Sequence, residues 1–429
     1  MCSSDLFVCV IGAQAGEARQ RPQAVVHAPL SGQAFVLFDE VRQSYPQLFG
    51  GALLTQTSGA YVYRLDAGTG NYVALTDTDI YLMGPVVASL STPVRYAALA
   101  NFCAQPQTAK FCGFKHQRTV TVDGIEREYI VYVPWKSRNA QNLPAVFMLH
   151  GTSGDGEQFY NQSGWREVAD SEGVITVFPT ALRHCLFEDD ITVNGIFDAN
   201  ERRTPTKWSS GILGDPAKMP LCTVAQRVGL EPAALAAVSH PLADDLTYFD
   251  RMVDDLKQNF RADAKRIYVS GFSNGGQMAV RLAAERSTTF AALASAAGNG
   301  YTGLPVAARP LSFIFSVGEL DDRFVTPLGV AALPLTDLGA STAFLGVMVK
   351  PIADPLQLDE TRYVFSATSL YGKQTSIHSY QTSEATPAAG NALHVAVIAG
   401  LFHQYPNGDN HSVKMAELLW GFFKPLSLP

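Results

Sequence analysis

From about residue 119 onward, two kinds of hydrophobic pattern alternate along the chain. Short continuous apolar runs are typical of strands buried on both faces, and longer amphipathic stretches are typical of helices with one buried face. The runs predict strands at residues 128–134, 145–150, 173–179, 267–269, 290–297, 311–317 and 393–399. The amphipathic stretches predict helices at residues 164–171, 242–260, 277–285 and 411–424. Strands that alternate with helices predict an α/β fold with a mostly parallel central sheet covered on both faces.

The first hundred residues have a different pattern. Residues 61–83 alternate apolar and polar positions in three short predicted strands, separated by turn residues. A further strand is expected at 35–38 and a short helix at 39–48. We therefore predict a β-rich accessory domain at 22–103, followed by the main domain at 104–429, with an insertion at about 324–390. The tyrosines of the accessory domain either form a polymer-binding face or pack against the main domain.

The N-terminal residues allow two interpretations. An apolar run at residues 6–12 precedes Ala13-Gln-Ala15, a pattern that resembles a signal-peptidase site. However, no Lys or Arg precedes the run, and Asp5 stands where a positive region would be expected. We favour a leader remnant at residues 1–21, and a buried strand is the alternative.

Composition and charge exclude several classes of function. The net charge of -7 gives no electrostatic footprint for nucleic acid or an anionic membrane. The sequence contains no apolar run of 18 residues, so no transmembrane helix is expected. Apolar residues make up 47% of the chain and charged residues 17%, which indicates a sizeable buried core. We expect a monomer.

The six cysteines indicate a compartment. Cys2 and Cys9 fall within the possible leader, and the other four form two sequence-local pairs. Two disulfides, one joining each pair, would fit an exported protein, whereas buried free thiols would fit a cytosolic one. Because no Cys/His cluster has zinc-site spacing, we expect neither a metal nor a cofactor. The two pairs are Cys103 with Cys112 and Cys185 with Cys222.

One stretch has the form of a nucleophile elbow. Gly271-Phe-Ser-Asn-Gly275 follows an apolar strand and precedes good helix formers. In a strand–turn–helix context, a G-x-S-x-G match holds the serine, here Ser273, in a strained turn above the sheet. The flanking glycines remove side chains that would clash in that turn.

Two later strand ends supply the other members of a catalytic triad. Asp321 and Asp322 follow the strand at 311–317, and His403 follows the strand at 393–399. The order Ser, Asp, His is that of the α/β-hydrolase fold. In such a triad the imidazole deprotonates the serine, and the carboxylate orients the imidazole. We assign His403 as the base and favour Asp321 as the acid, with Asp322 as the alternative.

The remaining site residues follow from these positions. The backbone N–H groups of Asn274 and Thr152 are expected to form the oxyanion hole, since one follows the nucleophile and the other follows His150 at the end of a central strand. Three aromatic residues are candidates for the substrate pocket: Trp208, Phe402 and Tyr405.

Together, these motifs resemble the polyhydroxybutyrate depolymerase and feruloyl esterase family. The resemblance covers roughly residues 115 to 424. It implies an α/β-hydrolase fold and a secreted serine esterase that forms an acyl-enzyme on Ser273 without a metal. The family usually has glycines directly before the catalytic histidine and a Trp two residues after it. This chain has Leu401-Phe402 and Tyr405 at those positions, so the pocket wall is expected to differ. The stretches that carry the resemblance are Leu149–Thr152, Gly164–Pro179, Asp244–Asp245, Val253–Leu256, Tyr268–Met278 and Gly400–Pro406.

These observations predict an exported serine carboxylesterase. Its expected substrates are feruloyl-type esters or polyhydroxyalkanoates, with aromatic polyesters as a side activity. Three alternatives remain open: a serine peptidase, an acyltransferase with the same triad, and a binding protein on a hydrolase scaffold.

Overall fold

The computed structural model describes residues 113–137, 139–187, 202–216, 218–382 and 391–429, and the backbone of five short strands before them. Several predictions lie outside the described residues: the helix at 39–48, the third strand of 61–83, and the pair Cys103 and Cys112.

The five N-terminal strands form two small antiparallel sheets. β1 pairs with β2, and β3, β4 and β5 follow one another in a three-stranded sheet. The strand predicted at 35–38 and two of those predicted within 61–83 are present. The accessory-domain boundary and the leader remain predictions. The strands are β1 (Val8–Ile11), β2 (Gln23–Val26), β3 (Phe35–Phe38), β4 (Tyr61–Leu65) and β5 (Tyr72–Leu75).

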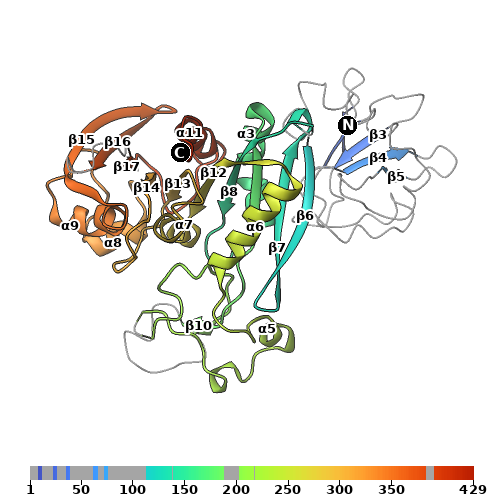
Figure 1. Cartoon of the computed structure of the whole chain (residues 1–429), viewed down its shortest axis with the longest axis horizontal. Helices are drawn as coiled ribbons and strands as arrows, with labels where there is room; N and C mark the ends of the chain where they lie inside the picture. Colours follow the sequence, from blue (N-terminus) through green and yellow to red (C-terminus); the bar gives the residue numbers. More distant parts are fainter. Residues whose placement is uncertain are drawn as a thin grey trace. The chain divides into compact units, whose positions relative to one another are not determined.

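A ten-stranded sheet organises the main part of the chain (Figure 1). Its order is β15-β16-β17-β14-β13-β12-β8-β9-β7-β6. Neighbours among β17, β14, β13, β12 and β8 are parallel, whereas β16 runs antiparallel to β15 and β17. The α/β-hydrolase fold class is thus confirmed. The strands are β6 (Gly113–Val122), β7 (Ile125–Pro134), β8 (Leu143–Leu149), β9 (Ile175–Pro179), β12 (Ala262–Phe272), β13 (Ala292–Ala296), β14 (Ser312–Gly318), β15 (Leu358–Leu370), β16 (Lys373–Thr382) and β17 (Ala392–Ile398).

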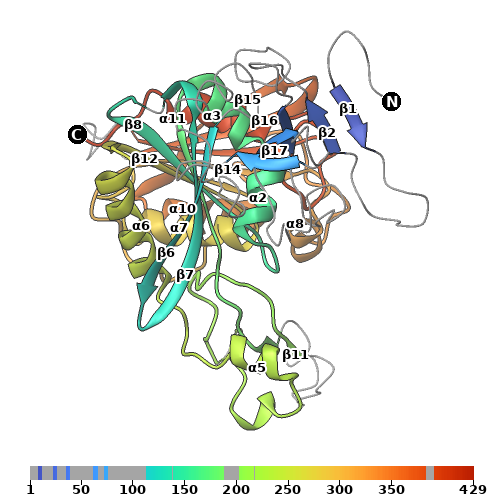
Figure 2. The ribbon, with the colours of Figure 1, turned by 90° about the vertical axis from the view of Figure 1, so that its right-hand side faces the viewer.

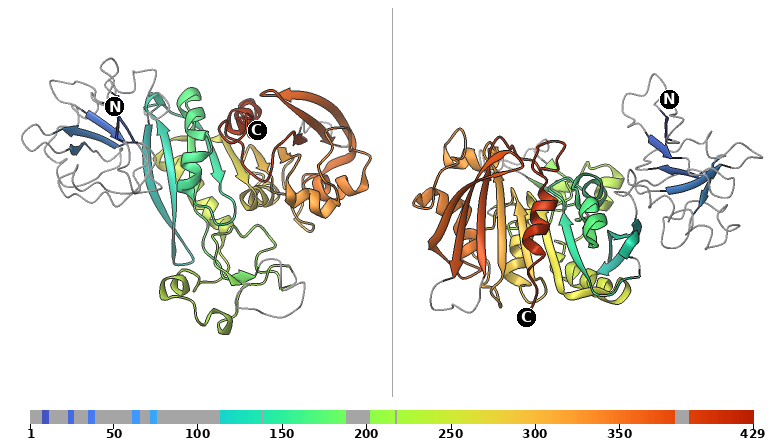
Figure 3. Two further views of the ribbon diagram at one scale, coloured as in Figure 1. Left: turned by 180° about the vertical axis from the view of Figure 1, so that it is seen from behind. Right: turned by 90° about the horizontal axis from the view of Figure 1, so that it is seen from above.

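Helices cover both faces of this sheet (Figure 3). On one face, Phe147 of β8 packs edge-on against Phe249 of α6, with ring centroids 5.7 Å apart. On the other face, Tyr268 of β12 stacks on Phe423 of α11 at 5.0 Å. The register of the two strands opposes Val269 to Phe147, and consecutive strand residues alternate faces, so these contacts lie on opposite sides. The helices are α2 (Gly156–Gln162), α3 (Trp165–Glu172), α5 (Pro232–Ala237), α6 (Asp245–Asn259), α7 (Asn274–Glu285), α8 (Asp322–Leu328), α9 (Thr342–Phe344), α10 (Lys350–Ala353) and α11 (Met415–Phe423).

The final helix begins later than predicted. We expected it from residue 411, but α11 starts at Met415 and His411 lies in the preceding loop. The side chain of His411 accepts a hydrogen bond from the Val413 N–H at 3.3 Å. Such a side-chain turn competes with helical hydrogen bonding over the residues where we expected the first turn.

The predicted insertion at 324–390 holds a hairpin that we did not predict. β15 and β16 extend the central sheet at one edge, and their turn places Tyr371 and Gly372 at φ values of 51° and 77°. Two positive φ values in succession are typical of a tight type I′ hairpin turn. Polar residues on both faces of these strands hid the alternation on which a strand prediction depends. Shorter helical segments precede the hairpin, including the π-helical turn η6 (Leu345–Val349).

A long excursion connects β9 to α6, and its described residues, 182–187, 202–216 and 218–242, project from the sheet (Figure 2). It contains short elements and one disulfide, Cys185–Cys222, which confirms the prediction for that pair. Among the described residues, none of the helices is long and apolar enough to cross a bilayer. The short elements are β10 (Leu186–Phe187), β11 (Arg202–Arg203), η5 (Ala225–Arg227) and α5; a further 3₁₀ turn, η3 (Trp135–Ser137), follows β7.

Candidate active site

Ser273 lies at the sharp turn between β12 and α7. Its backbone adopts a φ of 51°, a conformation that costs a non-glycine residue strain energy. The flanking glycines permit this turn. A Cβ on Gly271 would overlap the backbone of Gly275, and a Cβ on Gly275 would overlap the carbonyl group of His150. The strand–turn–helix that the motif predicts is therefore present.

The side chains of Ser273, His403 and Asp321 form one chain of hydrogen bonds. His403 Nε2 lies 2.9 Å from Ser273 Oγ. His403 Nδ1 lies 3.0 Å from each oxygen of the Asp321 carboxylate. A hydrogen bond donated by Nδ1–H to the carboxylate leaves Nε2 free to accept from the serine hydroxyl. This geometry is the one that a triad requires.

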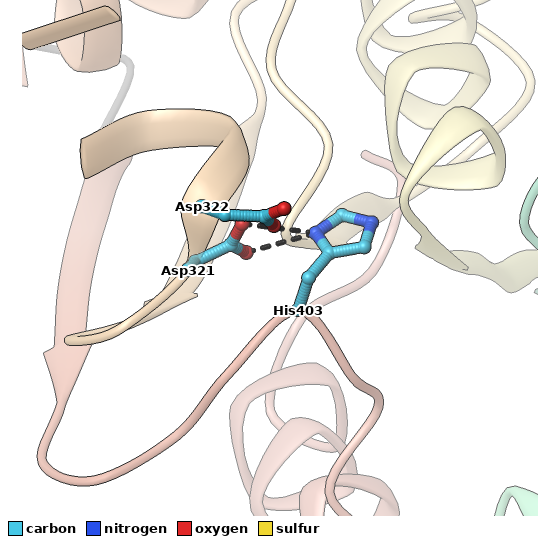
Figure 4. A group of neighbouring side chains, drawn as sticks. All are labelled: Asp321, Asp322 and His403. Atoms are coloured by element: carbon cyan, nitrogen blue, oxygen red, sulfur yellow. Dashed lines mark hydrogen bonds and ion pairs between the residues drawn. The ribbon is translucent and has the colours of Figure 1, made fainter. Parts of the chain in front are cut away.

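Figure 4 shows both acidic candidates beside the imidazole, with the hydrogen bonds running to Asp321. Asp321 is fully buried and caps α8, accepting from the Arg323 N–H at 3.0 Å. The Asp322 side chain is 70% exposed. A carboxylate that caps the first turn of a helix is held in a fixed orientation. The structure thus places Asp321 in the position expected of the acid.

These three residues also group as a possible cation site. Ligand atoms of Asp321, Asp322 and His403 lie within 4.8 Å of one another. A metal bound at His403 Nδ1 would replace the hydrogen bond between this nitrogen and Asp321. We interpret the cluster as the His–Asp part of the candidate triad, with Asp322 beside it.

Two other histidines have structural partners. His150 is fully buried; its Nε2 accepts from the Ala181 N–H at 3.0 Å, and its Nδ1 lies 2.7 Å from the Gly151 carbonyl oxygen. Burial lowers the pKa of His150 to about 4, so it is neutral near pH 7. His394 lies within β17 and contacts Ser379 at 2.8 Å. Both are placed as expected for residues other than the base.

The expected oxyanion donors lie on either side of the nucleophile. Asn274 is the first residue of α7, where helical geometry leaves its N–H without an acceptor inside the helix. The loop that bears Thr152 runs beside Ser273, since a Cβ on Gly151 would lie 3.2 Å from the serine Cβ. The catalytic role of the two N–H groups remains a prediction.

The three candidate pocket aromatics have different surroundings. Trp208 is fully buried, and its indole N–H donates to the His150 carbonyl at 2.9 Å, so it supports the site from within. Tyr405 is 6% exposed and lines a cleft beside the base, and burial raises the pKa of its hydroxyl. Phe402 is 58% exposed, next to His403 in the chain.

The cleft beside His403 has a volume of about 250 Å³. Phe159, Phe272 and Tyr405 contribute aromatic rings to it, and the Phe159 and Phe272 rings stack at 6.1 Å. Apart from His403 and Tyr405, its polar lining consists of five carboxamides and the Thr152 hydroxyl, which can both donate and accept hydrogen bonds. These polar residues are Thr152, Gln158, Gln162, Gln404, Asn407 and Asn410.

Sequence analysis did not identify the amide side chains of this cleft. Gln158 and Gln162 lie four residues apart on α2, so they share one face of that helix. In the sequence, the signal for these two cleft residues is their four-residue spacing directly after the glycine-rich loop at 151–156.

Comparison with known proteins relates the chain to hydrolases. The model of the prolyl oligopeptidase family matches residues 244–302, the stretch that contains Ser273. The chain is 26% identical over 199 residues to the bifunctional acetylxylan esterase/xylanase XynS20E of Neocallimastix patriciarum; the match covers 46% of this chain and 22% of that protein. The chain spans less than half the length of the curated relatives it matches.

Solved structures of hydrolases are also similar to this chain. An S-formylglutathione hydrolase from Agrobacterium tumefaciens is 15% identical with a TM-score of 0.40, covering 74% of this chain and 96% of its own. An acetyl xylan esterase from Aspergillus awamori is 14% identical with a TM-score of 0.39, covering 72% and 99%.

Proposed function

We propose that this protein is a serine carboxylic ester hydrolase with Ser273 as nucleophile, His403 as base and Asp321 as orienting acid. The observation that carries the proposal is the continuous chain of hydrogen bonds from Ser273 Oγ through the imidazole to the buried carboxylate. The resemblance to polyhydroxybutyrate depolymerases and feruloyl esterases supports the same reaction. The esterase name of the curated relative agrees with it.

The geometry suits a two-step reaction through an acyl-enzyme. In the first step, Ser273 Oγ attacks the ester carbonyl carbon while its proton passes to His403 Nε2. The tetrahedral oxyanion would be bound by the Thr152 and Asn274 N–H groups. Collapse expels the alkoxide, which takes the proton from His403 and leaves as the alcohol. In the second step, water attacks the acyl carbon while one of its protons passes to His403 Nε2. The bond to Ser273 Oγ then breaks, Oγ takes the proton back from His403, and the carboxylic acid is released.

The cleft favours an ester whose alcohol part is rich in hydroxyl groups. Its amide side chains can pair with sugar hydroxyls, and its aromatic wall can pack against a ring face. The feruloyl-type substrate fits this lining better than a polyhydroxyalkanoate, whose repeating unit has no hydroxyl donor. The exposed ring of Phe402 favours the polyester as the second candidate, because it gives an apolar chain a contact beside the base.

A substrate panel tests these assignments. Release of ferulate from feruloylated arabinoxylan, of acetate from acetylated xylan and of hydroxybutyrate from polyhydroxybutyrate would be measured in parallel. We expect the sugar-linked esters to be hydrolysed fastest, and Ser273→Ala to abolish all activities. Faster release of hydroxybutyrate would select the polyester instead.

The same panel separates the remaining classes. A peptidase with this triad would also cleave peptide p-nitroanilides, and the match to the prolyl oligopeptidase model makes that control necessary. An acyltransferase would transfer the acyl group to an added alcohol rather than to water. A binding protein would retain substrate and release no product.

We further propose an extracellular location. The Cys185–Cys222 disulfide supports it, because disulfides persist in oxidising compartments. Culture fractionation with an antibody against the protein would test it, and recovery in the cytosol alone would reject it.

A further inference from the structure

Residues 206–210, here called the bridging segment, contact both halves of the expected oxyanion hole. They belong to the excursion between β9 and α6 and lie outside its named helices and strands. On one side the segment meets the loop that follows β8. On the other it meets Asn274 at the start of α7.

Four hydrogen bonds join the bridging segment to the loop after β8. The N–H of Ser153 donates to the Thr206 carbonyl at 2.9 Å, and the Thr206 hydroxyl donates to the Gly154 carbonyl at 2.5 Å. The ammonium group of Lys207, itself 5% exposed, donates to the Thr152 hydroxyl at 3.2 Å. The Trp208 indole N–H donates to the carbonyl of His150. Residues on both sides of the expected donor Thr152, and Thr152 itself, are therefore held.

The side chain of Asn274 pairs with the same segment. Its Oδ1 accepts from the Trp208 N–H at 2.7 Å, and its Nδ2 donates to the Trp208 carbonyl at 3.3 Å and to the Ser210 hydroxyl at 3.2 Å. Asn274 is 2% exposed, so water does not compete for these bonds. Trp208 thus contacts both sides of the expected oxyanion hole. Its indole bonds to His150, at the start of the loop that bears Thr152, and its peptide groups bond to the Asn274 side chain.

A buried ion pair between Asp245 and Arg127 holds the bridging segment through Ser209. Asp245 accepts from both the N–H and the hydroxyl of Ser209, at 2.7 and 2.8 Å. The same carboxylate pairs with Arg127 at 2.7 Å, and both side chains are at most 1% exposed. Buried charges hold their geometry because loss of either partner leaves the other without compensation.

We propose that the bridging segment fixes the distance between the two oxyanion donors, with Trp208 as its central positioning residue. This inference rests on the proposed ester hydrolysis. Both donors must lie about 2.7–3.1 Å from a single oxygen of the transition state, so their separation matters as much as their presence. A misplacement of about 1 Å can cost about 10²-fold in rate. Trp208 acts on the reaction through the loop and Asn274 and touches no reacting atom.

The test compares two tryptophan substitutions. Trp208→Phe removes the indole N–H that holds the His150 carbonyl. Trp420→Phe makes the same change on α11, where the buried indole N–H has no hydrogen-bond partner among the described residues. For each variant, kcat per phosphonate-titrated active site would be measured, together with KM and the Ki of a trifluoromethyl ketone. The ketone forms a hemiketal on Ser273 and places an oxyanion in the hole.

We expect Trp208→Phe to lower kcat about 10–100-fold, to raise Ki by the same factor and to leave KM within about threefold. Trp420→Phe should leave all three values within about twofold. A purely structural role for Trp208 would lower the melting temperature and leave kcat per active site and Ki like those of Trp420→Phe; this result would overturn the proposal.

A second, milder variant keeps the test decisive if Trp208→Phe does not fold. Thr206→Val removes only the hydroxyl that holds the Gly154 carbonyl, and kcat and Ki should shift together by about 3–10-fold. Unchanged values would overturn the proposal. Wild-type activity that survives in Ser273→Ala would instead refute the proposed function, so the two failures are distinguishable.

Discussion

The triad and the bridging segment belong to one site but are built in different ways. Ser273, Asp321 and His403 each follow a strand of the central sheet: β12, β14 and β17. The bridging segment lies in an excursion and is held by hydrogen bonds to residues as far as 72 positions away, such as Arg281, which donates to Ser209. The first region uses regular backbone geometry, and the second uses buried polar side chains.

This difference suggests a division of labour. Parallel strands bring their carboxyl ends to one edge, so the three candidate triad residues meet there although they lie far apart in the sequence. The two N–H groups expected to bind the oxyanion lie on a loop and at the start of a helix. The sheet by itself does not fix the distance between them. Ser209 of the bridging segment forms a buried network with Asp245 and Arg127 that can hold this spacing.

Removing the nucleophile should have the largest effect. Ser273→Ala leaves no hydroxyl for His403 to activate, and kcat on p-nitrophenyl acetate should fall on the order of 10⁴–10⁶-fold. The matched control is Ser239→Ala, an exposed serine of the excursion, which should stay within about twofold. Activity that survives in the Ser273→Ala variant would show that Ser273 is not the nucleophile.

Removing the charge of the acid should have the next largest effect. Asp321→Asn keeps the side-chain shape but favours the wrong imidazole tautomer, so kcat should fall on the order of 10³–10⁴-fold. Asp322→Asn should change kcat less than about threefold, because that side chain is 70% exposed and lies outside the hydrogen-bonded chain. Equal losses in the two variants would show that the acids share the role.

The triad could be predicted because its signals are local. An apolar run followed by Gly, Asp or His marks each strand end, and the chain order Ser, Asp, His selects the fold. The sequence favours Asp321 over Asp322 only because Asp321 comes first after the strand. The structure adds the reason, since Asp321 caps α8 and faces the imidazole.

The bridging segment could not be predicted because its contacts are not local. The sequence makes Trp208 a candidate for the substrate pocket. Because the surrounding residues show no hydrophobic periodicity, the sequence does not indicate that its side chain is buried. Its hydrogen bonds with Asn274 and His150 depend on the folded positions of three separate segments. The hairpin β15–β16 escaped prediction for another reason, because its polar residues occupy both faces and weaken the period.

Removing the disulfide should lower the free energy of unfolding much more than it lowers kcat. Cys185 and Cys222 close a loop with a sequence separation of 37, so the double alanine variant should lose about 3–4 kcal/mol of unfolding free energy. Urea unfolding of the variant and the wild type would measure this loss. The bridging segment has its own anchor on Asp245, so kcat of the folded variant should fall less than in Trp208→Phe. A larger fall in kcat would show that the disulfide, rather than the polar network, positions the site.

The smallest predicted effect concerns His150, where the two regions meet. Its pKa is about 4 in the folded protein because of burial, against about 6.5 when unfolded. Between these values the unfolded chain binds more protons, so stability is lost as pH falls from about 6.5 to 4. His150 alone should remove about 2–3 kcal/mol of unfolding free energy between pH 7 and pH 4.5.

His150→Gln keeps an acceptor for the Ala181 N–H and cannot titrate, so the drop in unfolding free energy between pH 7 and pH 4.5 should shrink by that amount. His184 provides the control, because burial also lowers its pKa to about 4 but it lies in the excursion. His184→Gln should reduce the drop by a similar amount while kcat stays nearer to wild type. An undiminished drop in His150→Gln would mean that groups other than His150 cause the loss of stability in acid.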